Sequence, residues 1–266
     1  MNKAVLSGLA LVIVFLMFSP AGSPAAAQTV SPIDERLQTR VVEYDGATGK
    51  IKAYLALPKV RKGKLPAVIV IHENDGLRGY TEDIARRIAL EGYIAIAPSA
   101  LSTRKGGTPK DRRYARVAIW SLDRDATNKD FIGAIGFLRS MQEFDGNVGC
   151  LGSNWGGRLA IRLAAYSEDV KAAVSFYGGP LESEKVPKIK GALLLQYAGL
   201  DADIDKTVPE FTKDLDKAKI EYEIFTYPGV QHRFFNDTFP EKYNAAAAKL
   251  AWSRTIEFLN KELKSK

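Results

Sequence analysis

The sequence predicts a single-domain α/β fold with a mostly parallel central sheet and helices on both faces. Short apolar runs rich in β-branched residues alternate along the chain with segments of helical period, the order that builds such a sheet. Central runs such as 67–71 and 192–195 are apolar without alternation, as expected of parallel strands covered on both faces. The 266 residues are 46% hydrophobic and 26% charged, which suffices to bury a sizeable core.

The strands are expected where short apolar runs are bounded by glycine, proline or charged turns. These runs cover residues 51–57, 67–72, 93–97, 148–152, 172–177, 192–198 and 222–227. The charged segment Arg61-Lys-Gly-Lys64 is predicted to be a solvated turn between the first two strands.

The first helix has a predicted start, period and stop. Thr81 is expected to cap it, with Glu82 and Asp83 in the first turn, and Gly92 to end it. Its buried stripe would be Ile84, Ala85, Ile88 and Ala89. Further helices are expected over 130–139, 156–166, 208–218 and 243–263, the last with Leu250, Ala251, Phe258 and Leu259 on one face.

Composition excludes several classes of function. Lys and Arg total 38 against 31 Asp and Glu without a domain-sized basic block, so nucleic acid is not an expected partner. A single cysteine cannot close an intramolecular disulfide. Two histidines among scattered carboxylates do not have the spacing of metal ligands, so neither a metal nor a cofactor is implied.

Residues 1–27 are predicted to be an export signal that is removed. Lys3 supplies a charged start, residues 4–18 are largely apolar, and Ala25-Ala26-Ala27 offers a small-residue cleavage site. The alternative, a membrane anchor, would need an apolar run of about 20 residues. We therefore expect the domain to cover 28–266 from a mature start at Gln28, in an exported protein that is periplasmic or secreted and has no membrane contact after cleavage.

One turn has the form that exposes a nucleophile. Gly152-Ser-Asn-Trp-Gly-Gly157 directly follows a predicted strand and precedes a helix, the context in which a sharp turn lifts its middle residue above the sheet. That middle residue is Asn154. The glycines allow the backbone to turn sharply and the helix to approach the strand, although they also suit a plain tight turn.

Two later residues complete the order found in hydrolases of this architecture. Asp201 follows the strand 192–198, and His232 follows the strand 222–227. His232 could be a surface residue, but a histidine at this place can move protons near neutral pH. Asp203 and Asp205 compete for the acidic role, and Asp201 fits best because it lies closest to its strand.

Several motifs together resemble the dienelactone hydrolase family, in order and over nearly all of the chain after residue 28. They are Val68-Ile-Val-Ile-His-Glu-Asn-Asp-Gly76, Asp83-Ile-Ala-Arg-Arg-Ile88, Gly92-Tyr93, Ala97-Pro98, the turn 152–157, Ala198-Gly-Leu-Asp201 and Tyr227-Pro-Gly-Val-Gln-His232. The resemblance implies an α/β-hydrolase fold and hydrolysis of lactones or other small carboxylic esters. It also implies a Cys, Asp and His triad with a glutamate near the thiol.

The resemblance assigns roles to individual residues. It makes Asp201 the acid, His232 the base and Glu73 the nearby glutamate. The backbone N–H groups of Asn74 and Trp155 would form the oxyanion hole, as the loop geometry of the fold also suggests.

The nucleophile is the main departure from the family. Asn154 occupies the cysteine position, and a neutral carboxamide is not a useful nucleophile. Cys150 lies inside the preceding strand, where a packed and inert thiol is expected, and Ser153 would point elsewhere. Asn236 stands where dienelactone-cleaving members place an arginine for the substrate carboxylate, four residues after His232.

Other polar and aromatic residues near the strand ends have simpler roles. His72 is expected to be structural. Arg112, Arg113 and Arg116 lie in an expected helix and could face an anionic substrate, although a solvated helix face is the favoured interpretation. Tyr177, Trp155 and Phe234 could line an apolar pocket or belong to the core.

Two hypotheses of function remain open at this point. In the first, the protein hydrolyses a small ester or lactone: His232, oriented by Asp201, activates water, and Asn154 adds a hydrogen bond to the oxyanion. In the second, the protein is a pseudoenzyme whose retained pocket binds a small ligand or a protein partner. The substrate, the pathway and the oligomeric state stay open.

Overall fold

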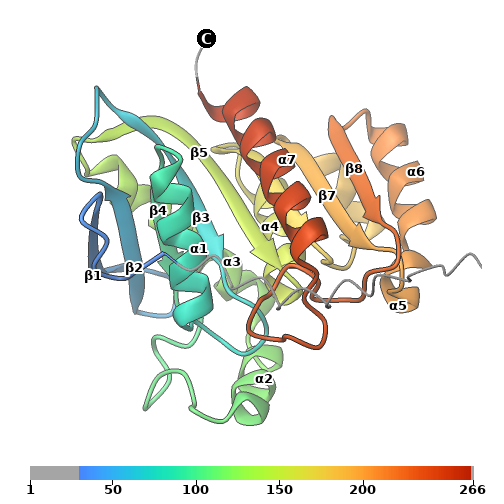
Figure 1. Ribbon diagram of the computed structural model, residues 1–266, viewed down its shortest axis with the longest axis horizontal. Coiled ribbons are helices and arrows are strands. Elements are labelled where there is room, and N and C mark those ends of the chain that lie inside the picture. The colour runs from blue at the N-terminus through green and yellow to red at the C-terminus, as the bar shows by residue number, and fades with distance from the viewer. Residues whose placement is uncertain (1–29, 265–266) are drawn as a thin grey trace, which may run out of the picture.

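The computed structural model describes residues 30–264, so the expected signal 1–27 and the start at Gln28 lie outside the described residues. One eight-stranded sheet forms the centre of the molecule (Figure 1). Its strands are β1 (Leu37–Asp45), β2 (Lys50–Pro58), β3 (Leu65–Ile71), β4 (Ile94–Pro98), β5 (Phe144–Ser153), β6 (Val170–Phe176), β7 (Ala192–Ala198) and β8 (Tyr222–Tyr227). They lie in the order β1-β2-β4-β3-β5-β6-β7-β8.

The mostly parallel sheet predicted from the sequence is confirmed. β4, β3, β5, β6, β7 and β8 all run parallel to one another, whereas β2 is antiparallel to both β1 and β4. The strand β1 was not predicted. It lies at the edge of the sheet and buries only Leu37 and Tyr44. Val41 is exposed, so the hydrophobic pattern of the strand is weak.

Helices cover both faces of the sheet, as expected (Figure 1). They are α1 (Gly79–Leu90), α2 (Arg112–Trp120), α3 (Arg124–Arg139), α4 (Trp155–Tyr166), α5 (Ala202–Asp205), α6 (Val208–Ala218), α7 (Ala245–Leu263) and a 3₁₀ helix, Ser183–Lys188. One core lies beneath α1 and α7, and a second lies beneath α3, α4 and α6. Within residues 30–264 no helix has the length and apolarity needed to cross a membrane.

The expected cap of the first helix is wrong. α1 begins at Gly79, and Thr81 is buried inside it. The N–H of Glu82 already bonds the carbonyl of Arg78, so the first turn forms before Thr81 could cap it. Gly92 follows the helix with a φ of 88°, consistent with the expected stop.

Two further helices differ in detail from the sequence expectation. α3 begins at Arg124 instead of residue 130, because the Asp123 side chain accepts a hydrogen bond from the N–H of Ala126 and caps the earlier turn. In α7, Leu250 is 47% exposed and does not share the buried face with Ala251. Successive helical residues are separated by about 100°, which carries Leu250 out of the buried stripe.

Four strands bring their carboxyl ends to one edge of the sheet. The segments after β3, β5, β7 and β8 carry Glu73, Asn154, Asp201 and His232, respectively. Because these strands are parallel within one sheet, residues far apart in the sequence meet at this edge. The helix α2 lies beyond the same edge (Figure 1).

Candidate functional site

Asn154 occupies the apex between β5 and α4, as the sequence predicted. Its backbone has φ 56° and ψ −118°, a left-handed φ that a non-glycine residue rarely adopts. The glycines beside it permit close packing. A Cβ on Gly156 would lie 2.5 Å from the carbonyl oxygen of His72 and 2.7 Å from that of Ile71, so only glycine lets α4 start this close to β3.

The Asn154 carboxamide joins a histidine to a backbone amide. Its Nδ2 lies 2.6 Å from Nε2 of His232, and its Oδ1 accepts a hydrogen bond of 2.6 Å from the N–H of Trp155. At a ψ of −118°, Cβ of Asn154 and the nitrogen of Trp155 are nearly eclipsed about the Cα–C bond, so the side chain reaches that N–H. The Trp155 N–H can donate only to the oxygen of the carboxamide, so this contact determines that the amide nitrogen faces His232.

Asp201 holds His232 from the other side. The Nδ1 of His232 lies 2.5 Å from Oδ2 of Asp201. A carboxylate only accepts, so Nδ1 donates, and Nε2 then accepts from the Asn154 amide in a neutral ring. Of the competing acids, Asp203 is exposed and pairs with Lys206.

Glu73 is the centre of a second, buried cluster. Its Oε1 accepts hydrogen bonds from Ser153 Oγ at 3.1 Å, Tyr177 Oη at 3.2 Å and Asn236 Nδ2 at 3.0 Å. Burial, together with the Glu73 charge, raises the pKa of Tyr177. The hydroxyl therefore stays protonated and donates the hydrogen bond to Glu73. The Nε of Arg233 lies 3.3 Å from Oε2 of Glu73.

Arg233 is a site residue that sequence reasoning missed. Its Nη2 donates to Oδ1 of Asn74 at 3.1 Å, and its guanidinium lies over the ring of Phe239 at 4.2 Å. Arg112 lies 4.8 Å from the same ring, and its Nε is 3.4 Å from a carboxylate oxygen of Asp75. The only sequence signal for Arg233 is its position directly after His232.

The remaining candidates separate into surface and core residues. Arg113 and Arg116 are exposed, as the solvated-face interpretation expects. Trp155 is buried and its ring stacks on that of His72 with centroids 5.2 Å apart, while Phe234 is fully buried. Of the three aromatics, Tyr177 places its hydroxyl in the site, 3.2 Å from Oε1 of Glu73.

Cys150 is a packed thiol, as expected. It is fully buried in β5, and its Sγ lies 3.5 Å from the carbonyl oxygen of Ala160. Burial raises the pKa of the thiol, so the reactive thiolate is not populated near neutral pH.

His72 has a structural role. Its Nδ1 lies 2.7 Å from the carbonyl oxygen of Glu73, and its Nε2 accepts from the N–H of Ala100 at 3.1 Å. Burial lowers the pKa of His72 from 6.5 to about 4. The ring is therefore neutral at physiological pH.

We expect this histidine to weaken the fold in acid. Above pH 6.5 His72 is neutral in both states, but between pH 6.5 and 4 it binds a proton only when the chain is unfolded. The free energy of unfolding should fall across that range by about 3 kcal/mol from His72 alone. Urea unfolding of wild type and His72→Gln at a series of pH values measures the difference. Parallel pH curves for the two proteins would contradict it.

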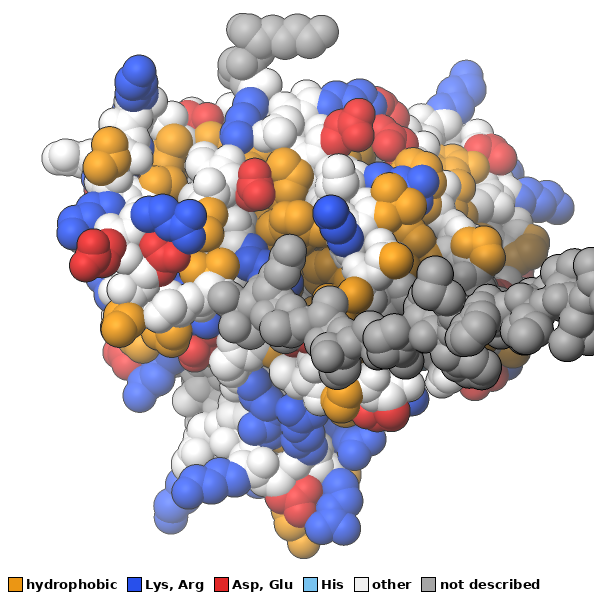
Figure 2. Space-filling view, in the orientation of Figure 1, with side chains coloured by type: hydrophobic (Ala, Val, Ile, Leu, Met, Phe, Trp, Pro, Cys, Tyr) orange, Lys and Arg blue, Asp and Glu red, His pale blue; other side chains and the backbone are white. Residues whose placement is uncertain are grey.

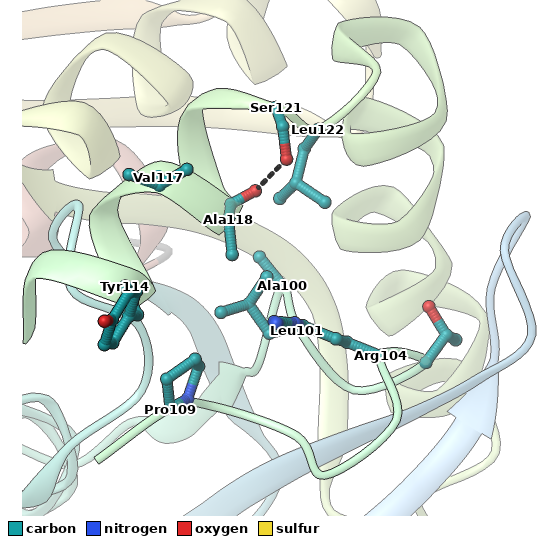
Figure 3. Close-up of a pocket in the computed structure, with 10 residues that line it drawn as sticks. Ala100, Leu101, Arg104, Pro109, Tyr114, Val117, Ala118, Ser121 and Leu122 are labelled. Carbon is teal, nitrogen blue, oxygen red and sulfur yellow. Dashed lines mark hydrogen bonds between the residues drawn. The ribbon is translucent and has the colours of Figure 1, made fainter. Parts of the chain in front are cut away.

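A separate cavity of about 630 Å³ lies between α2 and the loop after β4 (Figure 3). Ala100, Leu101, Tyr114 and Val117 line it, and none of its lining residues belongs to the clusters described above. Figure 2 shows Lys and Arg side chains gathered at the lower end of the molecule, where α2 lies in Figure 1. In the part of the chain that the structure describes, no three His, Cys, Asp or Glu side chains are grouped to hold a metal ion.

The sequence matches a family model and several named proteins over most of its length. The model of the dienelactone hydrolase family matches residues 51–263. A protein of Escherichia coli O157:H7 named carboxymethylenebutenolidase is 32% identical, over 91% of this chain and 93% of its own. A Bradyrhizobium protein named for 2-oxo-3-(5-oxofuran-2-ylidene)propanoate lactonase activity is 30% identical, over 80% of this chain and 91% of its own.

A solved structure has the same architecture. The crystal structure of a dienelactone hydrolase from Klebsiella pneumoniae subsp. pneumoniae MGH 78578 superposes with a TM-score of 0.77. It is 27% identical in sequence, and the match covers 84% of this chain and 98% of that one. The α/β-hydrolase fold expected from the sequence is thus confirmed.

Proposed function

Because the chain belongs to the dienelactone hydrolase family, we propose that it hydrolyses small carboxylic esters or lactones where Asn154 and His232 meet. The names of its relatives favour a lactone. The observation that carries the proposal is the contact of 2.5 Å between His232 and Asp201, with the other ring nitrogen directed at the apex of the turn. A histidine held in this way is oriented as a general base.

The proposed mechanism uses water in place of an enzyme nucleophile. His232 Nε2 takes a proton from water, and the resulting hydroxide attacks the carbonyl carbon of the ester. The N–H groups of Trp155 and Asn74 stabilise the oxyanion. His232 then returns the proton to the departing alkoxide oxygen as the carbon–oxygen bond breaks, which leaves an acid and an alcohol, or a single hydroxy acid from a lactone.

The same mechanism requires Asn154 to move. Its carboxamide engages both the lone pair of His232 and the N–H of Trp155, so a substrate must displace it from both. Hydrolysis should therefore be slow beside that of an enzyme with a built-in nucleophile, since the displaced hydrogen bonds oppose substrate binding.

Replacement of the base tests the proposal. We expect wild type to hydrolyse p-nitrophenyl acetate and a five-membered lactone, and His232→Gln and Asp201→Asn to lose at least about 100-fold in kcat/KM. Asp203→Asn, which changes a neighbouring exposed acid, serves as the matched control and should be as active as wild type. Absence of turnover in wild type, or equal rates in His232→Gln, would contradict hydrolysis and favour a binding protein.

We also propose that the protein is exported and that residues 1–27 are removed. The support is the sequence pattern of Lys3, the apolar run and the alanines at 25–27. Intact-mass measurement on protein from the periplasm or the culture medium should give a chain that starts at Gln28. Recovery of the full-length chain from the membrane fraction alone would contradict export.

A further inference from the structure

We propose that Asn154 is a substrate of its own site: the protein hydrolyses the Asn154 side-chain amide and converts this residue to aspartate. This inference depends on the His232 and Asp201 pair of the proposed function, but it concerns a different reaction. It assigns a modification site at the apex of the turn and, as its product, a carboxylate nucleophile.

The carboxamide lies where the acyl group of a substrate would lie. Its oxygen accepts from the Trp155 N–H, which is one of the expected oxyanion donors, and its nitrogen contacts the expected general acid and base. A tetrahedral intermediate at Cγ would therefore have its oxyanion stabilised by Trp155 and its leaving nitrogen beside His232. Because the amide is covalently attached to the chain, it stays in the site and needs no separate binding step.

The reaction balances with water as the only co-reactant. Water first takes the place of the Asn154 N–H at Nε2 of His232 and loses a proton to that nitrogen, and its oxygen bonds to Cγ of Asn154. The carbon–nitrogen bond then breaks as His232 returns the proton to Nδ2, which leaves as ammonia. Solvent can reach the site, because the His232 side chain is 27% exposed and Asn154 is half-buried.

Other asparagines lack this environment. His72, the second histidine, faces backbone groups of Glu73 and Ala100 through both ring nitrogens, so it contacts no side-chain amide. Asn236 donates to the carboxylate of Glu73, which neither stabilises an oxyanion nor supplies a proton. Within the described residues, His232 and Asn154 form the one pairing of a histidine with an asparagine side chain.

The product would change the chemistry of the apex. A carboxylate at position 154 is a nucleophile of a kind that enzymes use to form covalent intermediates, whereas the carboxamide is not. The Asn154 carboxamide of the translated chain would then be the precursor of a carboxylate nucleophile, which forms when His232 catalyses hydrolysis of the amide.

Timed mass spectrometry tests the conversion. Wild type is incubated at neutral pH in water enriched in ¹⁸O, digested, and the peptide that contains residue 154 is followed against the peptide of Asn236. We expect that position 154 alone gains one labelled oxygen and loses nitrogen, and that it does so at least about 100-fold faster than in His232→Gln. The Asn154→Asp variant supplies the authentic product for chromatography.

The outcomes of this experiment distinguish failure of the inference from failure of the proposed function. No conversion in wild type, or equal rates in wild type and His232→Gln, overturns the proposal. Isoaspartate as the main product also overturns it, because that isomer requires attack by the Trp155 nitrogen instead of water. If Asn154 is stable but ester hydrolysis depends on His232, this inference fails while the proposed function stands. If neither reaction depends on His232, both fail.

Discussion

Replacement of Asn154 by cysteine should raise the esterase activity by at least about 100-fold in kcat/KM. Two effects act together. A thiol on the same Cβ would lie beside Nε2 of His232, because Nδ2 of Asn154 is only 2.6 Å from that atom, and a thiolate near a histidine is a good nucleophile at neutral pH. The substitution also releases the Trp155 N–H from Oδ1, and a single oxyanion donor contributes about 10²–10³-fold to kcat.

The measurement is hydrolysis of p-nitrophenyl acetate by wild type and Asn154→Cys, with a burst of product expected from the acyl-enzyme of the variant. Iodoacetamide should abolish the activity of the variant and leave that of wild type unchanged, because Cys150 is buried and its raised pKa keeps it a thiol. The double variant Asn154→Cys/His232→Gln is the matched control and should lose the gain. A folded Asn154→Cys no more active than wild type would contradict the expectation.

Sensitivity of wild type to iodoacetamide would have a different meaning. Since Cys150 is the only cysteine, it would then be the working thiol, and the assignment of the turn would be wrong. The structure opposes that outcome, because Cys150 lies inside β5 against the carbonyl oxygen of Ala160.

The sequence was most informative where local chemistry restricts the residue type. Glycines at fixed spacing around Asn154 mark a close approach of α4 to the sheet, and unbroken apolar runs mark parallel strands. The order of Asp201 and His232 after their strands then places both at one edge, so their contact could be predicted from topology alone.

What could not be predicted depends on contacts between distant segments. Arg233 reaches Glu73 because the backbone after β8 turns with a φ of 75° at that residue, and no periodic pattern encodes such a turn. The orientation of the Asn154 amide depends on having two partners at once. The capping of α3 by Asp123 and the edge strand β1 were missed for a related reason, since neither produces a strong hydrophobic period.

The largest loss of stability is expected from Glu73→Ala. Glu73 is 2% exposed, accepts three side-chain hydrogen bonds and pairs with Arg233, whose side chain is 13% exposed. Its removal leaves the guanidinium without its counter-charge, and Tyr177 and Ser153 without their acceptor. Breaking a buried pair on one side lowers the free energy of unfolding by about 3–5 kcal/mol.

The alternative is that the charge of Glu73 matters little and only its volume and hydrogen bonds stabilise the fold. Glu73→Gln keeps both the volume and one acceptor oxygen. If the charge matters, the free energy of unfolding of this variant should still fall by about 1–3 kcal/mol, because hydrogen bonds to a charged group are replaced by weaker, neutral ones. Urea unfolding compares both variants with Glu168→Ala, an exposed position whose substitution should change the free energy of unfolding by less than about 0.5 kcal/mol.

A double variant separates the charge from the cavity. If the unpaired guanidinium causes most of the loss, Glu73→Ala/Arg233→Ala should be more stable than the sum of the two single variants predicts, by about 1–3 kcal/mol, because removal of both charges leaves no isolated ion. Additive losses would mean that Glu73 acts through packing alone. Since Arg233 also bonds Asn74, additive behaviour would further imply that this arginine is held by Asn74 and Phe239 and not by the carboxylate.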